Sequence, residues 1–511
     1  MKKLASWWFF SLAGGFVLLF AFFLRLKNLT LLPIFVDEAI YVRWAQVMKA
    51  ESTLRFVPLS DGKQPLFMWS VIPLFKLFKD PLFAGRFLSV MTGMATLLGL
   101  MALTYYLFKS KKAALLTGFT YAISPFMVFF DRMALVDSML AMFGVWTFLF
   151  AAITATTLRL DMAMITGFAL GGAYLTKSPA LFFSVLLPST WLLFEWKEKN
   201  KARIVTLLKL CGFTLVSFLI SQGMYNILRL GPNFHLLTSR NYDYVYSLGH
   251  IFQNPIDPFV PHLKDIWMWV CYLGPWPLLV LLLMGLAVCL SRKAKEGLIV
   301  LAWFIVPVLA QCMYAKVFTA RYILFTIPYL FVISSLWLFS KSRKVKTVGY
   351  LVVLLFIIFS VKQDYYFLTN PTQAALPRGE RSGYLEDWTA GNGIKEASLY
   401  LRDRYNQNPT EKIVVGTDGY FGTLPDGLQI YLNDISQITI VGVEVRFFSV
   451  PRPLIDSLKS GNETYLLVNS SRFFIADPKG EGLELVSSYP RATKPDGTHE
   501  SLLFYRLAPL K

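Results

Sequence analysis

The sequence predicts a polytopic α-helical membrane protein that carries a smaller α/β domain at its C-terminal end. The 511 residues are 55% hydrophobic and only 16% charged, with a mean hydropathy of +0.50, whereas soluble proteins contain about 25% charged residues. Apolar runs of about twenty residues recur along residues 1–362. Residues 363–511 are more polar and contain short strand-like runs.

The charge distribution argues against a nucleic-acid-binding protein, and the cysteines argue against a disulfide-bonded or metal-binding one. The net charge of +18 does not indicate nucleic-acid binding, because the basic residues are concentrated in short links between apolar runs. We therefore predict no nucleic-acid partner. Four cysteines lie in apolar segments without metal-ligand spacing, which is typical of small hydrophobic side chains in helices. They are Cys211, Cys271, Cys289 and Cys312.

About eleven membrane spans are expected from the apolar runs. They lie near residues 6–24, 84–108, 113–130, 138–157, 162–176, 179–196, 204–228, 266–290, 297–315, 321–340 and 345–362. The first run ends at Arg25 without a small-residue cleavage site, so we interpret it as an uncleaved span. The fifth is short, and Gly167, Gly171 and Gly172 would let neighbouring helices approach closely.

The basic residues of alternate loops define the cytoplasmic side of the membrane. They are Lys2, Lys3, Lys109, Lys111, Lys112, Arg159, Lys197, Lys199, Lys201, Arg203, Arg292, Lys293, Lys295, Lys341, Arg343, Lys344 and Lys346. With eleven spans, the N-terminus is then inside the cell and the C-terminus outside. Loop 25–83 and domain 363–511 are both expected to be extracytoplasmic.

Loop 25–83 contains two apolar stretches that predict helices at the membrane surface. Residues 38–50 place Tyr41, Trp44 and Met48 at helical spacing. Residues 66–78 are too short to span and are interrupted by Pro73. Together these helices could cover an active site.

The C-terminal residues predict a mixture of short strands and helices, in a domain of ordinary size. Strands are expected at 412–416, 438–443, 464–469, 483–488 and 501–507, and helices near 393–406 and 426–434. Gly391-Asn392-Gly393 lacks the third glycine of a dinucleotide fingerprint, because Glu396 occupies that place. We therefore predict no nucleotide site.

Carboxylates occur at two external boundaries between loop and helix. Asp37 and Glu38 are neighbours and cannot face the same way in a helix. They could serve chemistry, or they could cap the helix that follows. Asp131, Arg132 and Asp137 occupy the next external loop, where Asp137 begins a span and could also be a cap.

Several cations lie at external ends of the spans, where basic residues are usually sparse. These are Lys63, Arg86, Lys177 and Arg321. Each could simply extend toward the membrane interface, but together they indicate an anionic ligand such as a phosphate. A carboxylate could then deprotonate an acceptor hydroxyl while the cations neutralise the departing phosphate.

No metal site is predicted from the histidines. His235, His250 and His262 match no ligand spacing. Acids beside a phosphate can hold a divalent metal or act without one, so metal dependence stays open at this point.

Five motifs in order resemble those of the dolichyl-phosphate-mannose protein mannosyltransferases and the bacterial lipid A aminoarabinose transferases. Asp37-Glu38 resembles their Asp-Glu signature, and Leu175-Thr176-Lys177-Ser178-Pro179 resembles Leu-Thr-Lys-Gly-Pro with serine replacing glycine. The others are Gly62-Lys63-Gln64-Pro65, Arg132-Met133-Ala134-Leu135-Val136-Asp137 and Arg321-Tyr322. The resemblance covers about residues 1–340.

This resemblance implies a GT-C fold in residues 1–362, with residues 363–511 as a separate domain, and a polyprenyl-phosphate-linked sugar as donor. It assigns Asp37 as general base, Glu38 as a group that either assists or binds the acceptor, and Asp137 as a supporting carboxylate. Lys63, Arg132, Lys177 and Arg321 with Tyr322 would contact the lipid phosphate, and Arg86 is a weaker candidate. The acceptor could be a glycan, a lipid or a protein.

Departures from the family refine the prediction. The Trp-Trp-Asp signature of oligosaccharyltransferases is absent, and the inserted β-trefoil of eukaryotic mannosyltransferases is missing. We therefore expect an inverting glycosyltransferase in the cell membrane of a prokaryote, with its active site outside. A transporter or flippase of a lipid-linked sugar, and a membrane scaffold whose external domain binds a partner, are the alternatives.

Overall fold

The computed structural model describes residues 2–196, 201–292 and 294–508 of the chain. Lys197, Lys199 and Lys293, which the sequence assigns to cytoplasmic loops, lie outside the described residues. The chain divides into two compact units. The first comprises Met1–Leu29, Glu51–Ser70 and Arg86–Pro377, and the second Thr30–Ala50, Val71–Gly85 and Arg378–Lys511. The second unit therefore combines parts of the first predicted loop with the C-terminal residues.

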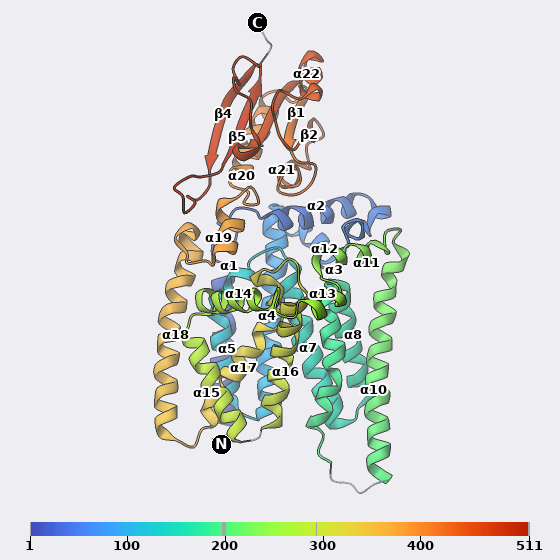
Figure 1. The fold of residues 1–511 in the computed structure, drawn as a ribbon, viewed down its shortest axis with the longest axis vertical. Helices are drawn as coiled ribbons and strands as arrows, with labels where there is room; N and C mark the ends of the chain where they lie inside the picture. Colours follow the sequence, from blue (N-terminus) through green and yellow to red (C-terminus); the bar gives the residue numbers. More distant parts are fainter. Residues whose placement is uncertain (1, 197–200, 293, 509–511) are drawn as a thin grey trace. The chain divides into compact units, whose positions relative to one another are not determined.

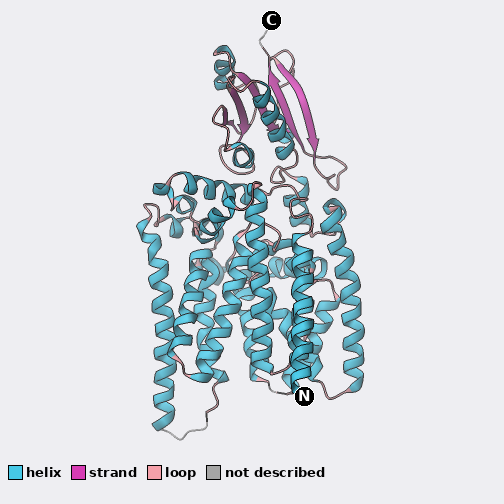
Figure 2. Ribbon diagram, turned by 180° about the vertical axis from the view of Figure 1, so that it is seen from behind, coloured by secondary structure: helices cyan, strands magenta, loops and turns pink. Residues whose placement is uncertain are grey.

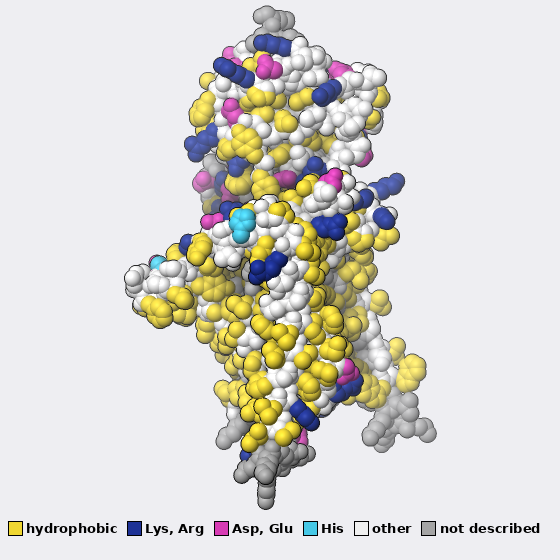
Figure 3. Space-filling view, turned by 90° about the vertical axis from the view of Figure 1, so that its right-hand side faces the viewer, with side chains coloured by type: hydrophobic (Ala, Val, Ile, Leu, Met, Phe, Trp, Pro, Cys, Tyr) yellow, Lys and Arg dark blue, Asp and Glu magenta, His cyan; other side chains and the backbone are white. Residues whose placement is uncertain are grey.

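Long apolar helices dominate the first unit (Figure 1). They are α1 (Lys2–Leu26), α4 (Pro81–Phe108), α7 (Val136–Thr157), α10 (Lys201–Tyr225), α16 (Lys295–Tyr314) and α18 (Arg343–Thr369). Within the described ranges, six helices are long and apolar enough to cross a membrane. Figure 3 shows that hydrophobic side chains cover much of one face of this helical bundle. Their exposure is typical of a surface that contacts lipid.

Shorter helical segments account for the other predicted spans. They are α5 (Lys111–Ala122), α6 (Pro125–Phe130), α8 (Leu160–Thr176), η4 (Ser178–Ala180), α9 (Leu181–Leu186), η5 (Leu187–Leu193), α15 (Pro277–Ser291), η7 (Ala320–Ile323), α17 (Ile327–Ser334) and η8 (Leu336–Phe339). The segments between the spans add α3 (Leu66–Val71), η3 (Ile72–Lys76), α11 (Leu236–Ser239), α12 (Asn241–Tyr244), α13 (Leu248–Gln253) and α14 (Phe259–Leu273). All eleven predicted spans thus coincide with helical structure.

Several of those spans are not continuous helices, and the breaks in 266–290 and 113–130 correct the sequence prediction most clearly. The predicted span 266–290 consists of α14 and α15, which meet at an angle of 110° near Gly274 and Pro275; α14 lies across the direction of α15 (Figure 1). If this bent pair forms one span, the apolar helices number seven. The predicted span 113–130 breaks at Ser124, because Pro125 disfavours helical geometry in the residue before it.

Glycine brings α8 and α10 together as predicted. A Cβ atom on Gly167 would lie 2.8 Å from both the Ser217 carbonyl oxygen and Ile220 Cβ, and one on Gly171 would lie 2.4 Å from Met224 Sδ. These separations are below normal contact distances, so the two helices can approach this closely only where side chains are absent.

The second unit contains a five-stranded sheet and its helices (Figure 2). The strands are β1 (Ile413–Asp418), β2 (Ile438–Glu444), β3 (Glu463–Asn469), β4 (Leu483–Pro490) and β5 (Ser501–Leu507), in the order β2-β1-β3-β5-β4. Its helices are α2 (Val36–Ala50), α19 (Arg378–Arg381), α20 (Ile394–Gln407), α21 (Asp426–Leu432) and α22 (Arg452–Lys459), with a single π-turn at Ser382–Glu386. Each predicted strand is present within two residues of its expected ends, while α22 was not predicted.

The sheet is mixed. β1 is parallel to both β2 and β3, with Val415 opposite Ile440 and Tyr465. β5 is antiparallel to β3 and β4. Buried side chains from β1, β3 and β5 form a core with α22, in which Leu454, Leu466 and Phe447 are completely or almost completely buried. This core buries Leu466 and Val468 on one face of β3, and Tyr465 on the other face packs against Tyr400 of α20.

Candidate functional site

A buried ion pair joins two of the predicted site residues in the first unit. Asp137 occupies the first turn of α7, where the helix dipole favours a carboxylate. Lys177 follows α8 in an extended conformation, which turns its side chain away from the helix. Its Nζ lies 2.6 Å from Asp137 Oδ1, and the Asp137 side chain is only 4% exposed.

Arg321 and Tyr322 join this pair from η7. The Lys177 ammonium lies 4.3 Å from the centre of the Tyr322 ring, and the Arg321 guanidinium carbon lies 5.4 Å from the same centre. Two cations therefore lie close to the same aromatic ring. We call Asp137, Lys177, Arg321 and Tyr322 the cation cluster. It combines two of the predicted motifs with Asp137, the final residue of a third.

The loop containing Lys63 lies beside the cation cluster. Gln64 Nε2 donates a hydrogen bond to Ser178 Oγ over 2.9 Å, and Ser178 is the residue next to Lys177. Lys63 Nζ lies 3.2 Å from Asp61, which also pairs with Arg240 at 2.6 Å. The serine that replaces the family's glycine thus accepts a bond from another motif. Asp61 and Arg240 were not predicted, because an exposed acid and a distant arginine carry no local signal.

Arg86 and Arg132 are buried and donate to backbone carbonyl groups. Arg86 Nη1 donates to the Leu29 carbonyl over 2.9 Å. Arg132 donates to carbonyl groups in and just after the last turn of α1, at 2.9 Å to Leu24, 2.6 Å to Lys27 and 2.9 Å to Asn28. Carbonyls at a helix C-terminus lack partners within the helix. Arg132 therefore caps α1, a role that the predicted phosphate contact did not include.

A second buried ion pair explains Asp131. Arg25 Nε lies 2.9 Å from Asp131 Oδ2, and both side chains are completely buried. Tyr121 and Ser138 donate further hydrogen bonds to the same carboxylate, at 3.0 and 2.7 Å. Because each charge is paired and hydrogen-bonded, this pair can hold α1 against α5 and α7. Arg25 was interpreted from the sequence only as the end of a span.

Asp364 is a buried carboxylate in α18 that the sequence did not single out. Neither of its oxygens accepts a hydrogen bond from the part of the chain that the structure describes. Arg25 and Arg132 interact with it electrostatically. Of the two buried carboxylates near the end of α1, Asp131 is therefore the one that forms an ion pair with a buried arginine.

Asp37 and Glu38 belong to the second unit, in the first turn of α2. Glu38 is completely buried, and its Oε2 accepts a hydrogen bond from the Phe35 backbone N–H over 3.0 Å. This is the geometry of a capping box, in which the third helical residue reaches back to the residue before the helix. Asp37 is partly buried and lies on a different side of the helix. The structure thus gives the two neighbours different environments.

Two of the three histidines considered in the sequence analysis, His250 and His262, make contacts with neighbouring residues. His262 is buried and its Nδ1 lies 3.0 Å from the Cys312 carbonyl oxygen. His250 stacks on Tyr246 with ring centres 4.0 Å apart. Among the described residues, no group of three or more His, Cys, Asp or Glu side chains could hold a metal ion.

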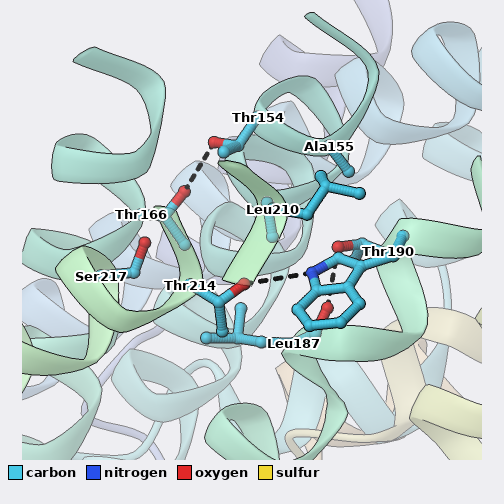
Figure 4. Close-up of a pocket in the computed structure, with 10 residues that line it drawn as sticks. Thr154, Ala155, Thr166, Leu187, Thr190, Leu210, Thr214 and Ser217 are labelled. Atoms are coloured by element: carbon cyan, nitrogen blue, oxygen red, sulfur yellow. Dashed lines mark hydrogen bonds between the residues drawn. The ribbon is translucent and has the colours of Figure 1, made fainter. Parts of the chain in front are cut away.

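A small cavity in the helical bundle lies between α7, α8, η5 and α10 (Figure 4). Its volume of about 10 Å³ is room for about one water molecule. Hydroxyl groups line it, and they bond within the bundle: Trp191 Nε1 donates to Thr214 over 3.1 Å, and Ser217 donates to the Ala163 carbonyl over 2.7 Å. No charged side chain lines this cavity, so it offers nothing to bind a phosphate.

The fold is similar to those of the solved structures of ArnT and of an oligosaccharyltransferase. Residues 62–221 match the family model described as dolichyl-phosphate-mannose-protein mannosyltransferase. Three of the five motifs lie within these residues, including those that contain Lys63 and Lys177. The resemblance predicted from the motifs is confirmed.

Particular solved structures match nearly the whole chain. ArnT from Cupriavidus metallidurans in the apo state has 14% identity and a TM-score of 0.60, covering 98% of each chain. The same protein bound to undecaprenyl phosphate has 15% identity and a TM-score of 0.58, covering 97% of each chain. The oligosaccharyltransferase of Archaeoglobus fulgidus in the apo form has 13% identity and a TM-score of 0.51, covering 98% of this chain and 74% of that one.

At such low sequence identity, the structural similarity establishes the fold and does not establish the activity. Comparison with curated protein sequences gave no match. The chain is therefore a multi-pass integral membrane protein with an ArnT-like fold and a C-terminal mixed α/β domain.

Proposed function

We propose that this protein is a glycosyltransferase that moves a sugar from a polyprenyl-phosphate-linked donor to an extracytoplasmic acceptor. The observation that carries the proposal is the cation cluster, in which Lys177 and Arg321 flank Tyr322 beside buried Asp137. Its setting in an ArnT-like fold supports the choice of donor, because ArnT has been solved with undecaprenyl phosphate bound.

Lys177, Arg321 and Lys63 are the groups that bind the donor phosphate in this proposal. The charge on the departing phosphate increases as the sugar–oxygen bond breaks, and positioned cations stabilise that charge. Asp137 fixes the Lys177 ammonium through the 2.6 Å contact. Arg86 and Arg132 contribute positive charge and position α1, since their guanidinium groups already donate to its C-terminal carbonyls and to Leu29.

Asp37 is the general base. The acceptor hydroxyl oxygen attacks the anomeric carbon, the bond from that carbon to the phosphate oxygen breaks, and Asp37 takes the hydroxyl proton. The products are the glycosylated acceptor and polyprenyl phosphate, and a single displacement inverts the anomeric configuration. Glu38 assists by fixing the first turn of α2 through its bond to the Phe35 N–H.

The reaction takes place outside the cytoplasm of a prokaryotic cell, at the outer face of the plasma membrane. With eleven spans, the N-terminus inside and the C-terminus outside, the basic residues of the alternate short loops lie on the cytoplasmic side, as the positive-inside rule requires. The acceptor is a glycan, a lipid or a protein that reaches this face.

One observation favours a second function, the transport of a lipid-linked sugar. The α14–α15 pair bends by 110°, and broken helices are typical of transporters. A flippase would move the donor across a vesicle membrane without releasing polyprenyl phosphate, whereas the transferase releases it. A scaffold, by contrast, has no need of the cation cluster.

The phosphate role of Arg321 gives the first test. We expect Arg321→Ala to weaken binding of undecaprenyl phosphate about tenfold or more, because it removes charge-assisted hydrogen bonds worth about 1.5–3 kcal/mol. Binding is measured in purified protein by titration with the lipid. Arg229→Ala is the matched control, since Arg229 is an exposed arginine that pairs with Asn226 and Phe234. Equal affinity in wild type and Arg321→Ala would contradict the assignment.

A further inference from the structure

The carboxyl ends of the three parallel strands meet at one edge of the sheet in the second unit. β1 ends at Asp418, β2 at Glu444 and β3 at Asn469. The chain leaves β1 for β2 on one side and then crosses to β3 on the other. The β1–β3 junction is therefore the topological switch point of the sheet, where open α/β sheets place their ligands.

A buried polar network marks this switch point. Asp418 is completely buried, and its Oδ2 accepts bonds from Asn469 at 2.8 Å and Arg472 at 3.0 Å. Arg491 donates to Asn469 over 2.6 Å. In the described chain, Asp418 Oδ1 accepts no hydrogen bond, and leaving a buried carboxylate oxygen unpaired is costly.

Exposed aromatic side chains surround the network. Tyr420 and Phe421 follow β1, and their side chains are 66% and 46% exposed. Trp388 is exposed and stacks on the Arg472 guanidinium at 4.3 Å. Phe448 and Phe474, which follow β2 and β3, are exposed and stack on each other at 5.2 Å. Every parallel strand is thus followed by exposed aromatic side chains at the same edge.

This edge lies beside the helix that carries Asp37. The Val36 N–H donates to the Thr389 carbonyl over 3.1 Å, directly next to Trp388. A Cβ atom on Gly422 would lie 3.2 Å from a Val36 methyl carbon. α21, which follows the β1 loop, contacts α2 through the hydrogen bond from Gln46 to the Ile430 carbonyl (Figure 1). All these residues belong to the same compact unit.

We infer that Trp388, Tyr420, Phe421 and Arg472, with Asp418 beneath them, form an acceptor subsite that binds a saccharide. This inference rests on the proposed function, because the acceptor must present a hydroxyl group to Asp37. Sugar rings have apolar C–H faces that pack on aromatic rings and polar edges that bond to carboxylate and guanidinium groups.

The same residues disfavour the other two acceptors. An acyl chain would strip water from the partly exposed Arg472 guanidinium without replacing the hydrogen bonds to that water. An extended peptide commonly adds to a free strand edge. The edge strands of this sheet are β2 and β4, whereas the site lies at the end of β1, which is paired on both sides. The saccharide alone uses both the aromatic and the polar groups of the site.

Saccharide binding to the full-length protein in detergent tests the inference. The probes are mannotriose, maltotriose and chitotriose, and their binding is measured by saturation-transfer NMR. Binding of undecaprenyl phosphate is measured in the same samples. We expect at least one trisaccharide to bind, and Trp388→Ala and Tyr420→Ala to weaken its binding at least fivefold. Trp388→Phe should retain most of the affinity, and the affinity for undecaprenyl phosphate should not change.

Leu485→Ala is the matched control, because Leu485 is an exposed side chain on β4, outside the parallel strands. Tyr420 is largely exposed, so its replacement tests the site even if Trp388→Ala misfolds. Binding of no trisaccharide, or equal binding by wild type and both alanine variants, would overturn the inference. Binding only of a Ser/Thr-containing hexapeptide would also overturn it, in favour of a protein acceptor. Failure of the wild-type protein to bind undecaprenyl phosphate would instead overturn the proposed function.

Discussion

At the residue scale, Asp37 and Glu38 are neighbours with different surroundings. The sequence left both open as catalytic or capping residues, because either carboxylate suits the start of a helix. The bond from the Phe35 N–H to Glu38 shows which of them closes the capping box. This distinction depends on backbone geometry, which a two-residue motif does not contain.

Glu38 substitutions separate the two roles. We expect Glu38→Ala to destabilise the protein by about 1 kcal/mol, because it removes a cap at the start of α2. Glu38→Gln should keep both stability and most of the transfer rate, since glutamine also completes a capping box. Melting temperature and transfer rate measured on the same preparations check both expectations. A Glu38→Gln protein that melts normally but transfers no sugar would place Glu38 in the chemistry.

Lys177 has both a structural and a proposed binding role. We expect Lys177→Met to destabilise the protein by about 3 kcal/mol, because Asp137, with 4% of its side chain exposed, would keep an unpaired charge. Adding Asp137→Asn should restore much of the lost melting temperature without restoring donor binding. Thermal unfolding and lipid titration of the single and double variants measure the two effects separately. Recovery of donor binding in the double variant would show that Lys177 has no part in holding the phosphate.

At the element scale, helix ends and breaks account for most differences between expectation and structure. Hydropathy places the spans but does not report their direction, so the bend between α14 and α15 was not predicted. The phosphate contact of Arg132 stays a prediction, and its capping of α1 could not be predicted because its carbonyl partners lie more than a hundred residues earlier in the chain. The strands were predictable because their alternating or buried apolar runs are bounded by polar turns.

The α8–α10 contact gives a prediction at this scale. Gly167→Leu should destabilise the bundle by about 1–3 kcal/mol, because its Cβ would lie 2.8 Å from the Ser217 carbonyl oxygen. Gly212→Leu is the matched control, since Gly212 lies on α10 and has no neighbouring atom within 4 Å of an added Cβ. Melting temperatures of the two variants provide the comparison. Equal melting temperatures would show that close approach at Gly167 does not matter for stability.

At the scale of the whole molecule, the proposed chemistry is divided between the two compact units. The cation cluster, Lys63, Arg86 and Arg132 lie in the first unit, and Asp37 lies in the second with the C-terminal sheet. From the sequence, Asp37 was assigned to loop 25–83 of the membrane domain, whereas in the structure it belongs to the unit that contains the C-terminal sheet. The grouping of α2 with α21 depends on contacts between residues nearly 400 positions apart, such as Gln46 with Ile430.

The residues proposed to bind the donor phosphate belong to the first unit, and those proposed as the base and the saccharide subsite belong to the second. Donor binding and acceptor binding should therefore respond to different sets of substitutions. Arg321→Ala should affect the first, and Tyr420→Ala the second.

Donor turnover by wild type and Asp37→Asn tests the central claim most directly. The purified proteins receive a panel of undecaprenyl-phosphate monosaccharides together with an extract of envelope acceptors, and the release of undecaprenyl phosphate is measured. The account predicts release by wild type with at least one sugar, and a loss of at least a thousandfold in Asp37→Asn, which should still bind the donor. Equal release by the two proteins, or donor binding by wild type without release from any member of the panel, would contradict it.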